Sequence, residues 1–83
     1  SILEIDFRYE QIRISRDEIR LGEYEVELAL ERYNEGLADN RELIDAQNRL
    51  TQAEYNDLNT RYMYSLSRLK FAKLAGLLEN IFQ

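Results

Sequence analysis

The sequence predicts an all-α fold, an antiparallel two-helix coiled-coil hairpin, from three observations. The 83 residues include no proline and only three glycines, which is too little turn punctuation for a mixed fold of this length. Apolar residues recur at steps of three, four and seven on both sides of the middle of the chain, a spacing that places them on one face of a helix. Residues 36–40 carry signals for the end of one helix and the start of another.

Helix 1 is expected over about residues 2–35. Its apolar residues form two stripes at nearby angles, which indicates a broad apolar face or two seams that face two neighbouring helices. Gly22 lies within this segment and costs about 1 kcal/mol relative to alanine, so we expect close packing there. The first stripe is Phe7, Ile14, Leu21 and Leu28, and the second is Ile5, Tyr9, Ile12, Ile19, Val26, Leu30 and Tyr33.

The turn is expected at residues 36–40. Gly36 suits the left-handed position just past a helix C-terminus. Asp39 with Glu42 three residues later reads as a capping box, and Asn40 is a competing N-cap. A single continuous helix of about 80 residues is the alternative, and it would have to override these signals.

Helix 2 is expected over about residues 41–80. Asp45 with Arg49, and Asp57 with Arg61, have the favourable spacing for ion pairs within a helix. Two apolar seams follow this helix. The first is Leu43, Ala46, Leu50 and Ala53, weakening at Asp57 and Thr60 and resuming at Tyr64, Ser67, Phe71, Leu74, Leu78 and Ile81. The second is Tyr55, Leu58, Tyr62, Leu66, Leu69 and Ala72.

A hairpin can bury one seam of each helix against the other helix, so the remaining seams require further helices. We therefore expect this chain to associate with itself as a dimer or larger bundle, or to belong to a larger helical assembly.

Composition excludes several functions. The absence of Cys and His removes Cys/His zinc sites, thiol catalysis and imidazole acid–base chemistry, and the acids lack metal-ligand spacing. We expect no enzyme activity, no catalytic residues, no cofactor and no bound metal. The net charge of −5 argues against nucleic-acid binding. No apolar run approaches the roughly 20 residues that span a bilayer, and no signal peptide is recognised, so no direct membrane insertion by this segment is expected.

The segments Tyr33–Leu37 and Glu42–Gln47 together resemble the TolC-like outer-membrane efflux channel family. That family typically has Tyr-x-x-Gly, a short polar turn, then an acid, two aliphatic residues, often Asp, and Ala-Gln. Its following long helix commonly ends in a Leu-x-x-x-x-Gly-x-Leu type segment, which residues 69–78 match loosely. The resemblance covers roughly residues 20–78.

The resemblance implies that residues 1–83 are one hairpin from the periplasmic α-barrel of a larger, homotrimeric outer-membrane channel. Such a channel serves efflux or type I secretion, and exported substrate passes through it passively. Its hairpin tips close the tunnel and meet a periplasmic adaptor (membrane fusion) protein. The alternative is a stand-alone coiled-coil interaction module or scaffold in the cytoplasm.

The resemblance also implies two groups of site residues. Carboxylates repeated around a trimeric entrance would attract cations. Some family members have a latch arginine two residues after the glycine, where this chain has Ala38, so the latch is absent or moved, with Arg41 as a candidate. Two local interpretations stay open, namely Glu42 as the capping-box acid and Asp45 as the partner of Arg49. The adaptor-docking tip comprises Gly36, Leu37, Ala38, Asp39 and Asn40, and the entrance or gate comprises Tyr33, Glu42 and Asp45.

Overall fold

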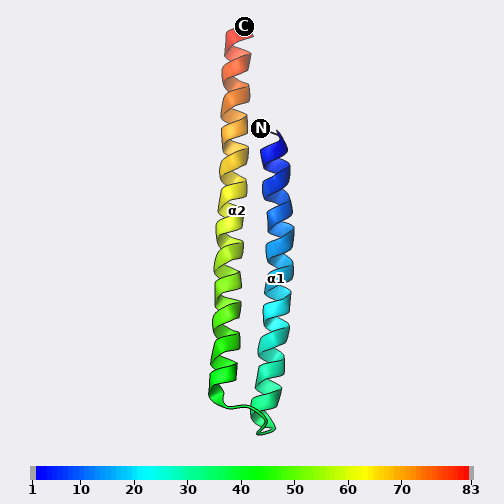
Figure 1. Ribbon diagram of the computed structural model, residues 1–83. Helices are drawn as coiled ribbons and strands as arrows, with labels where there is room; N and C mark the ends of the chain where they lie inside the picture. The colour runs from blue at the N-terminus through cyan, green and yellow to red at the C-terminus, as the bar shows by residue number, and fades with distance from the viewer. Residues whose placement is uncertain (1, 83) are drawn as a thin grey trace.

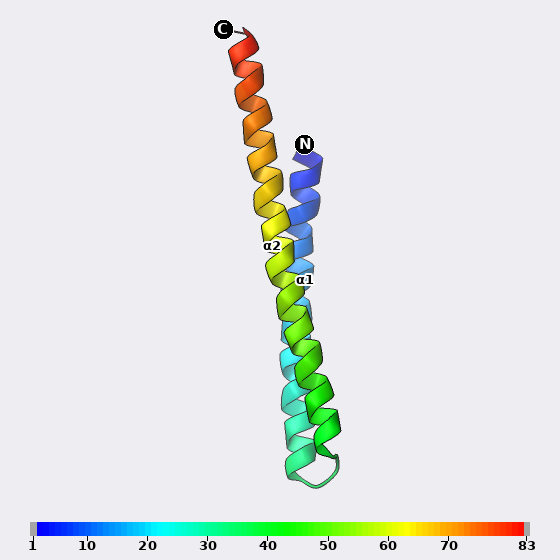
Figure 2. The same cartoon turned by 90° about the vertical axis from the view of Figure 1, so that its left-hand side faces the viewer.

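The computed structural model describes residues 2–82 and contains two helices, α1 (Ile2–Asn34) and α2 (Asn40–Phe82). The helices run antiparallel and side by side, and a short turn joins them at one end (Figure 1, Figure 2). The hairpin measures 71 × 14 × 11 Å. The predicted all-α hairpin is therefore confirmed, and the continuous helix is wrong. The helix bounds differ from the expected ones by one or two residues.

Contacts across the hairpin keep one register along α1. In each contact the two residue numbers add up to 72, 73 or 74, which is what two antiparallel helices in a fixed register require. These contacts are Tyr9 with Tyr64, Ser15 with Asp57, Gly22 with Leu50, Glu25 with Arg49, and Arg32 with Glu42.

The seam between the helices pairs large side chains with small ones. On this register, Ile12 of α1 is level with Thr60, and Val26 is level with Ala46. In the layers between, Gly22 contacts Leu50. The seam residues are all buried or half-buried. They are Ile5, Arg8, Ile12, Ser15, Ile19, Gly22, Val26 and Ala29 of α1, with Leu43, Ala46, Leu50, Ala53, Asp57, Thr60, Tyr64, Ser67 and Phe71 of α2.

The first predicted seam of helix 2 therefore faces α1 as far as Phe71. Of the second predicted stripe of helix 1, the residues at seven-residue spacing (Ile5, Ile12, Ile19, Val26) face α2. Tyr9 and Tyr33 of that stripe are 60% and 46% exposed, so they lie at its margin. Between these residues the contact is made by Arg8, Ser15 and Gly22, which an apolar pattern does not mark.

The other two predicted seams face outward. The α1 outer stripe (Phe7, Ile14, Leu21, Leu28) is 40–58% exposed, and the α2 outer stripe (Tyr55, Leu58, Tyr62, Leu69) is 64–68% exposed. Of the other two residues predicted for this seam of helix 2, Ala72 is exposed and Leu66 is half-buried. Among the described residues, the buried apolar side chains are Ile12, Ala29 and Ala46. One hairpin thus buries little apolar surface and leaves an apolar stripe on the outer side of each helix.

The C-terminal end of α2 extends past the start of α1 (Figure 1). The register places Ile2 level with residues 70–72, so residues 73–82, here termed the α2 overhang, lie beyond Ile2 along the hairpin axis. Leu74, Leu78 and Ile81 continue the seam spacing into the overhang and are 53%, 48% and 73% exposed.

Candidate functional site

The turn end of the hairpin begins with a hydrogen-bonded helix stop. The Leu37 N–H donates to the Arg32 carbonyl at 2.8 Å, and the Gly36 N–H donates to the Tyr33 carbonyl at 3.1 Å. This pair of bonds is the Schellman motif, which requires a left-handed residue just past the helix. Gly36 supplies it with φ of 75°. The expected role of Gly36 is confirmed.

The start of α2 is capped by Asp39. Its Oδ1 atom accepts the backbone N–H groups of Arg41 at 3.1 Å and Glu42 at 3.3 Å. These bonds satisfy two donors that a helix N-terminus leaves without partners inside the helix. Asp39 is therefore the N-cap, and Asn40 is the first residue of α2.

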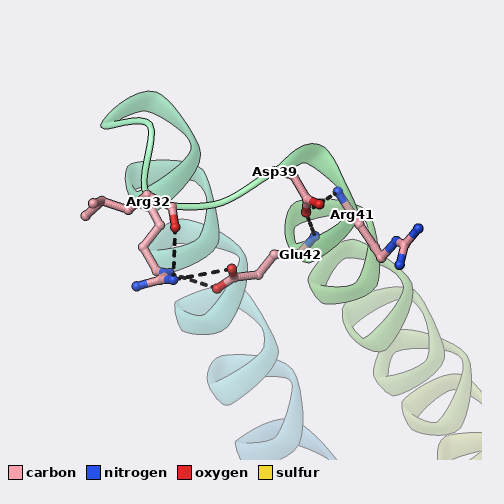
Figure 3. A network of polar contacts seen from close by, with 5 residues as sticks. Arg32, Asp39, Arg41 and Glu42 are labelled. Atoms are coloured by element: carbon pink, nitrogen blue, oxygen red, sulfur yellow. Dashed lines mark hydrogen bonds and ion pairs between the residues drawn. The ribbon is translucent and has the colours of Figure 1, made fainter.

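Arg32 connects both helices and the turn (Figure 3). Its Nε donates to Glu42 Oε1 at 2.8 Å, and its Nη2 donates to the Leu37 carbonyl at 3.3 Å and to Glu42 Oε2 at 3.5 Å. The carboxylate of Glu42 thus bonds across the turn to α1. In a reciprocal capping box the Glu42 carboxylate would bond back to the start of α2. It bonds to Arg32 instead, so the local interpretation of Glu42 as the acid of such a box is wrong.

Sequence reasoning did not select Arg32. The available signal was a basic residue in the last turn of helix 1 with an acid in the first turn of helix 2, which a tight turn brings together. The proposed latch candidate, Arg41, extends its side chain away from the turn in Figure 3. Arg32, rather than Arg41, is the arginine that bonds across the turn to α2.

The other predicted tip and gate residues lie on the surface of this end. Leu37 is 63% exposed, Gly36, Asp39 and Asn40 are exposed, and Ala38 is half-buried. Tyr33 and Asp45 are also exposed. The Nε of Arg49 donates to Glu25 Oε2 of α1 at 3.1 Å, so Arg49 pairs across the hairpin and not with Asp45. The local interpretation of Asp45 is therefore wrong.

A polar layer interrupts the seam midway along α1. Ser15 Oγ lies 2.8 Å from Asp57 Oδ1 and 2.9 Å from the Ile12 carbonyl, so it can donate to either. Arg61 Nε donates to Asp57 Oδ2 at 2.9 Å, which confirms the predicted Asp57/Arg61 pair. The hydrogen bond from Arg61, followed by that from Ser15, lowers the pKa of the Asp57 carboxyl below its ordinary value.

Within residues 2–82, no group of three or more Asp and Glu side chains is arranged to hold a metal ion. Across the same residues, neither helix has a stretch long and apolar enough to cross a membrane. The described residues form a hairpin with a capped turn at one end and an exposed apolar stripe along each helix.

These features define the class of structure as an antiparallel helical hairpin with an outward apolar stripe on each helix. Comparison of the chain with protein-family models, with curated proteins and with solved structures found no match.

Proposed function

We propose that this chain is a periplasmic hairpin of a homotrimeric outer-membrane efflux or type I secretion channel. In that role it forms part of the export tunnel wall and presents its turn to a periplasmic adaptor protein. The observation that carries the proposal is the pair of outward apolar stripes, because a helix in a tunnel wall needs a neighbour on each side.

The geometry of the stripes suits side-by-side packing. At about 100° per residue, the α1 outer stripe lies roughly 130° from the α1 face of the seam, and the α2 outer stripe roughly 150° from the α2 face. Each helix therefore has one apolar face toward its own partner and one facing away from it. Tyr55, Leu58 and Tyr62 also line a groove of about 250 Å³ that a neighbouring side chain can fill.

The turn suits docking and gating in this proposal. Leu37 offers an exposed apolar side chain beside the rigid, doubly capped turn. Because the Glu42 carboxylate is engaged by Arg32, Asp45 is the stronger candidate for a ring of carboxylates at the tunnel entrance. Breaking the Arg32–Glu42 pair would remove a side-chain link between α1 and α2 beside the turn, so in this proposal Arg32 takes the place of the latch that Ala38 lacks.

The test is site-specific photo-crosslinking in cells that produce the full product of the reading frame. A photoreactive residue at Leu37 is expected to form a covalent adduct with a periplasmic adaptor, identified by mass spectrometry. The same residue at exposed Glu54, far from the turn, is the control and should give none. A product found only in the cytoplasm, or adducts that do not depend on position, would rule out the channel.

The alternative function is a stand-alone coiled-coil interaction module or scaffold. The exposed apolar side chains along both helices favour it equally, because any helical partner could cover them. Cell fractionation separates the two functions, since a scaffold of this kind is expected in the cytoplasm.

A further inference from the structure

We propose that the α2 outer stripe is a homodimer interface, on which two copies of the chain pair with their α2 helices antiparallel about a two-fold axis beside Leu58. The inference goes beyond the channel and does not rest on it. Hairpins whose turns all meet one adaptor must point the same way, whereas the two hairpins of this dimer point in opposite directions. A second copy is thereby named as the partner of the stand-alone interaction module.

The middle of the α2 outer stripe has a hole that fits one side chain of a facing helix. Tyr55, Leu58, Asn59 and Tyr62 line a groove of about 250 Å³ and lie at positions i, i+3, i+4 and i+7. Four residues with this spacing form the hole of knobs-into-holes packing between helices. The two tyrosines and Leu58 are 64–68% exposed, so the hole is open to a partner.

The stripe is complementary to a second copy of itself. With the two-fold axis beside Leu58, the numbers of facing residues in an antiparallel pair add up to about 117. Tyr55 then faces the partner's Tyr62, and Leu58 enters the hole of the partner. Two-fold symmetry repeats each contact, and an interface between identical copies requires this reciprocity.

Charged side chains on the two flanks of the stripe match the same arrangement. At about 100° per residue, Glu54 and Arg61 lie on one flank and Asp45 and Lys73 on the other, each roughly 80° from the centre of the stripe. All four side chains are exposed. In a two-fold antiparallel pair each flank faces the same flank of the partner. Glu54 therefore lies beside the partner's Arg61, and Asp45 lies beside the partner's Lys73.

The bond that Arg61 makes within its own chain is compatible with this contact. Its Nε donates to Asp57 Oδ2 at 2.9 Å. A guanidinium carries five N–H donors, so the other nitrogens can bond to the partner's Glu54. Symmetry doubles both ion pairs, which places four contacts between opposite charges around the apolar centre.

The α1 outer stripe lacks this complementarity. Both of its flanks are predominantly acidic, so two copies of this stripe would bring like charges together, which opposes association. The α2 outer stripe is therefore the one that fits its own copy. The flanking residues of α1 are Glu10, Asp17, Tyr24 and Glu31 on one side, and Glu4, Gln11, Glu18, Glu25 and Arg32 on the other.

The contact is long. The facing α2 helices overlap over residues 44–73, about 45 Å or eight turns. Ile44 and Leu69, which are 48% and 66% exposed, extend the apolar face on either side of the hole. The dimer should therefore have twice the mass of one hairpin and a length still near 71 Å.

Sedimentation equilibrium of the chain at increasing concentration tests for the dimer. Leu58→Asp places two like charges at the two-fold axis and should weaken dimerisation by about a hundredfold or more. Leu21→Asp, at a position 58% exposed on the α1 outer stripe, is the matched control and should change it by less than about threefold. Circular dichroism checks that both variants stay helical.

Two results of this experiment would overturn the proposal. The first is a chain that stays monomeric, or a dimer that Leu58→Asp leaves unchanged. The second is a dimer lost equally in Leu58→Asp and Leu21→Asp, because both stripes would then be in contact. That second result would leave the side-by-side contact of the channel wall standing.

An exchange of charges tests the flanks. Asp45→Lys places a lysine beside the partner's Lys73 at two symmetric positions and should weaken dimerisation by about tenfold at low salt. Adding Lys73→Asp to the same chain recreates the opposite charges and should restore dimerisation to within about threefold of the native chain. A single variant without effect, or a double variant without recovery, would overturn the antiparallel register.

Crosslinking tests the orientation of the two helices, because the chain has no cysteine. Thr51 and Ser65 are exposed, and antiparallel pairing places each beside the other in the partner. A mixture of Thr51→Cys and Ser65→Cys chains should therefore couple through a short bis-maleimide. Thr51→Cys alone should not couple, since its two copies lie about 21 Å apart along the axis. Efficient coupling of Thr51→Cys to itself would mean parallel helices and would overturn the proposal.

Discussion

The three glycines of this chain have three different environments. Gly22 faces Leu50 across the seam, Gly36 has φ of 75° in the turn, and Gly76 lies in the overhang with open space where a side chain would be. Only Gly36 adopts a backbone conformation that other residues rarely take. The turn therefore requires glycine at position 36. Gly76 lowers the stability of α2, and no close contact in the hairpin compensates for that loss.

We therefore expect opposite effects from two alanine substitutions. Gly36→Ala should lower the free energy of unfolding by about 1 kcal/mol, because alanine disfavours the left-handed conformation. Gly76→Ala should raise it by about 0.5–1 kcal/mol through better helix propensity. Urea unfolding followed by circular dichroism measures both. Equal effects of the two substitutions would contradict the assigned turn.

Asp39 and Asn40 are neighbours with different roles at the start of α2. Because the Asp39 carboxylate accepts two backbone N–H groups, Asp39→Ala should cost about 1 kcal/mol of stability. Asn40→Ala should change stability by less than about 0.5 kcal/mol, as expected for an exposed position away from such features. Thermal unfolding of the two variants side by side decides which residue is the cap.

The Asp57 layer makes stability depend on pH. The pKa of this carboxyl is lowered in the folded chain, first by the Arg61 hydrogen bond and then by Ser15, from an ordinary value of 3.8. The unfolded chain therefore binds the proton more readily. The stabilisation is present above pH ~4 and is lost as the pH falls through 3.8 toward the folded pKa.

Substitution of Asp57 tests this dependence. Asp57→Asn should flatten the decline of unfolding free energy between pH 5 and pH 2, roughly the range in which carboxylates titrate. Ser15→Ala should give an intermediate slope, because it removes one of two causes. Urea titrations at each pH provide the measurement, and an unchanged slope in Asp57→Asn would assign the acid sensitivity to other carboxylates.

At the scale of the elements, the seam depends on small residues. A Cβ atom on Gly22 would lie 3.2 Å from Leu50 Cδ1 and 3.3 Å from its Cα, so the two helices approach closely at this layer. Ser15 and Ala29, one heptad away on either side, are also buried. Close approach lets Ile12, Ile19 and Val26 reach the opposite helix between these positions.

A large side chain at this layer should push the helices apart. We expect Gly22→Leu to lower the free energy of unfolding by about 1–3 kcal/mol through overpacking, despite the better helix propensity of leucine. The neighbouring residue Glu23 is exposed, so Glu23→Leu is the matched control and should stay within about 0.5 kcal/mol. Chemical denaturation of both variants compares them, and equal values would mean that the layer is not tightly packed.

At the scale of the whole molecule, the hairpin is a long rod with little interior. Its dimensions of 71 × 14 × 11 Å leave most apolar side chains on the surface. Two helices alone form a small core, and stability of such structures often depends on association. Further copies or partners would therefore contribute much of the apolar burial that one chain lacks.

The thermal midpoint of the isolated chain should consequently rise with protein concentration. Association of folded chains stabilises them by mass action, with about 1.4 kcal/mol for each tenfold gain in binding. Circular dichroism melts across a hundredfold range of concentration measure the effect. A midpoint independent of concentration would contradict self-association of the isolated chain.

Much of the fold could be predicted from residues whose signals are local. The turn followed from Gly36 and Asp39, since a left-handed position and a helix cap are set by neighbouring backbone atoms. The first seam of helix 2 followed from its spacing. The α1 side of the seam was harder to predict from the sequence. Ser15 and Gly22 are buried against α2 because they are small, and a small residue carries no apolar signal in the sequence pattern.

The sequence by itself determined two helices, the turn between them and the presence of more apolar faces than one hairpin can bury. These depend on backbone propensity and on the helical repeat, which act over a few residues. Only the tertiary structure decided the register, and with it the pairing of Arg32 with Glu42 and of Arg49 with Glu25. Those features depend on which residues of α1 and α2 lie opposite one another along the hairpin axis. That is a property of the packed pair, in which large side chains must meet small ones along the whole seam.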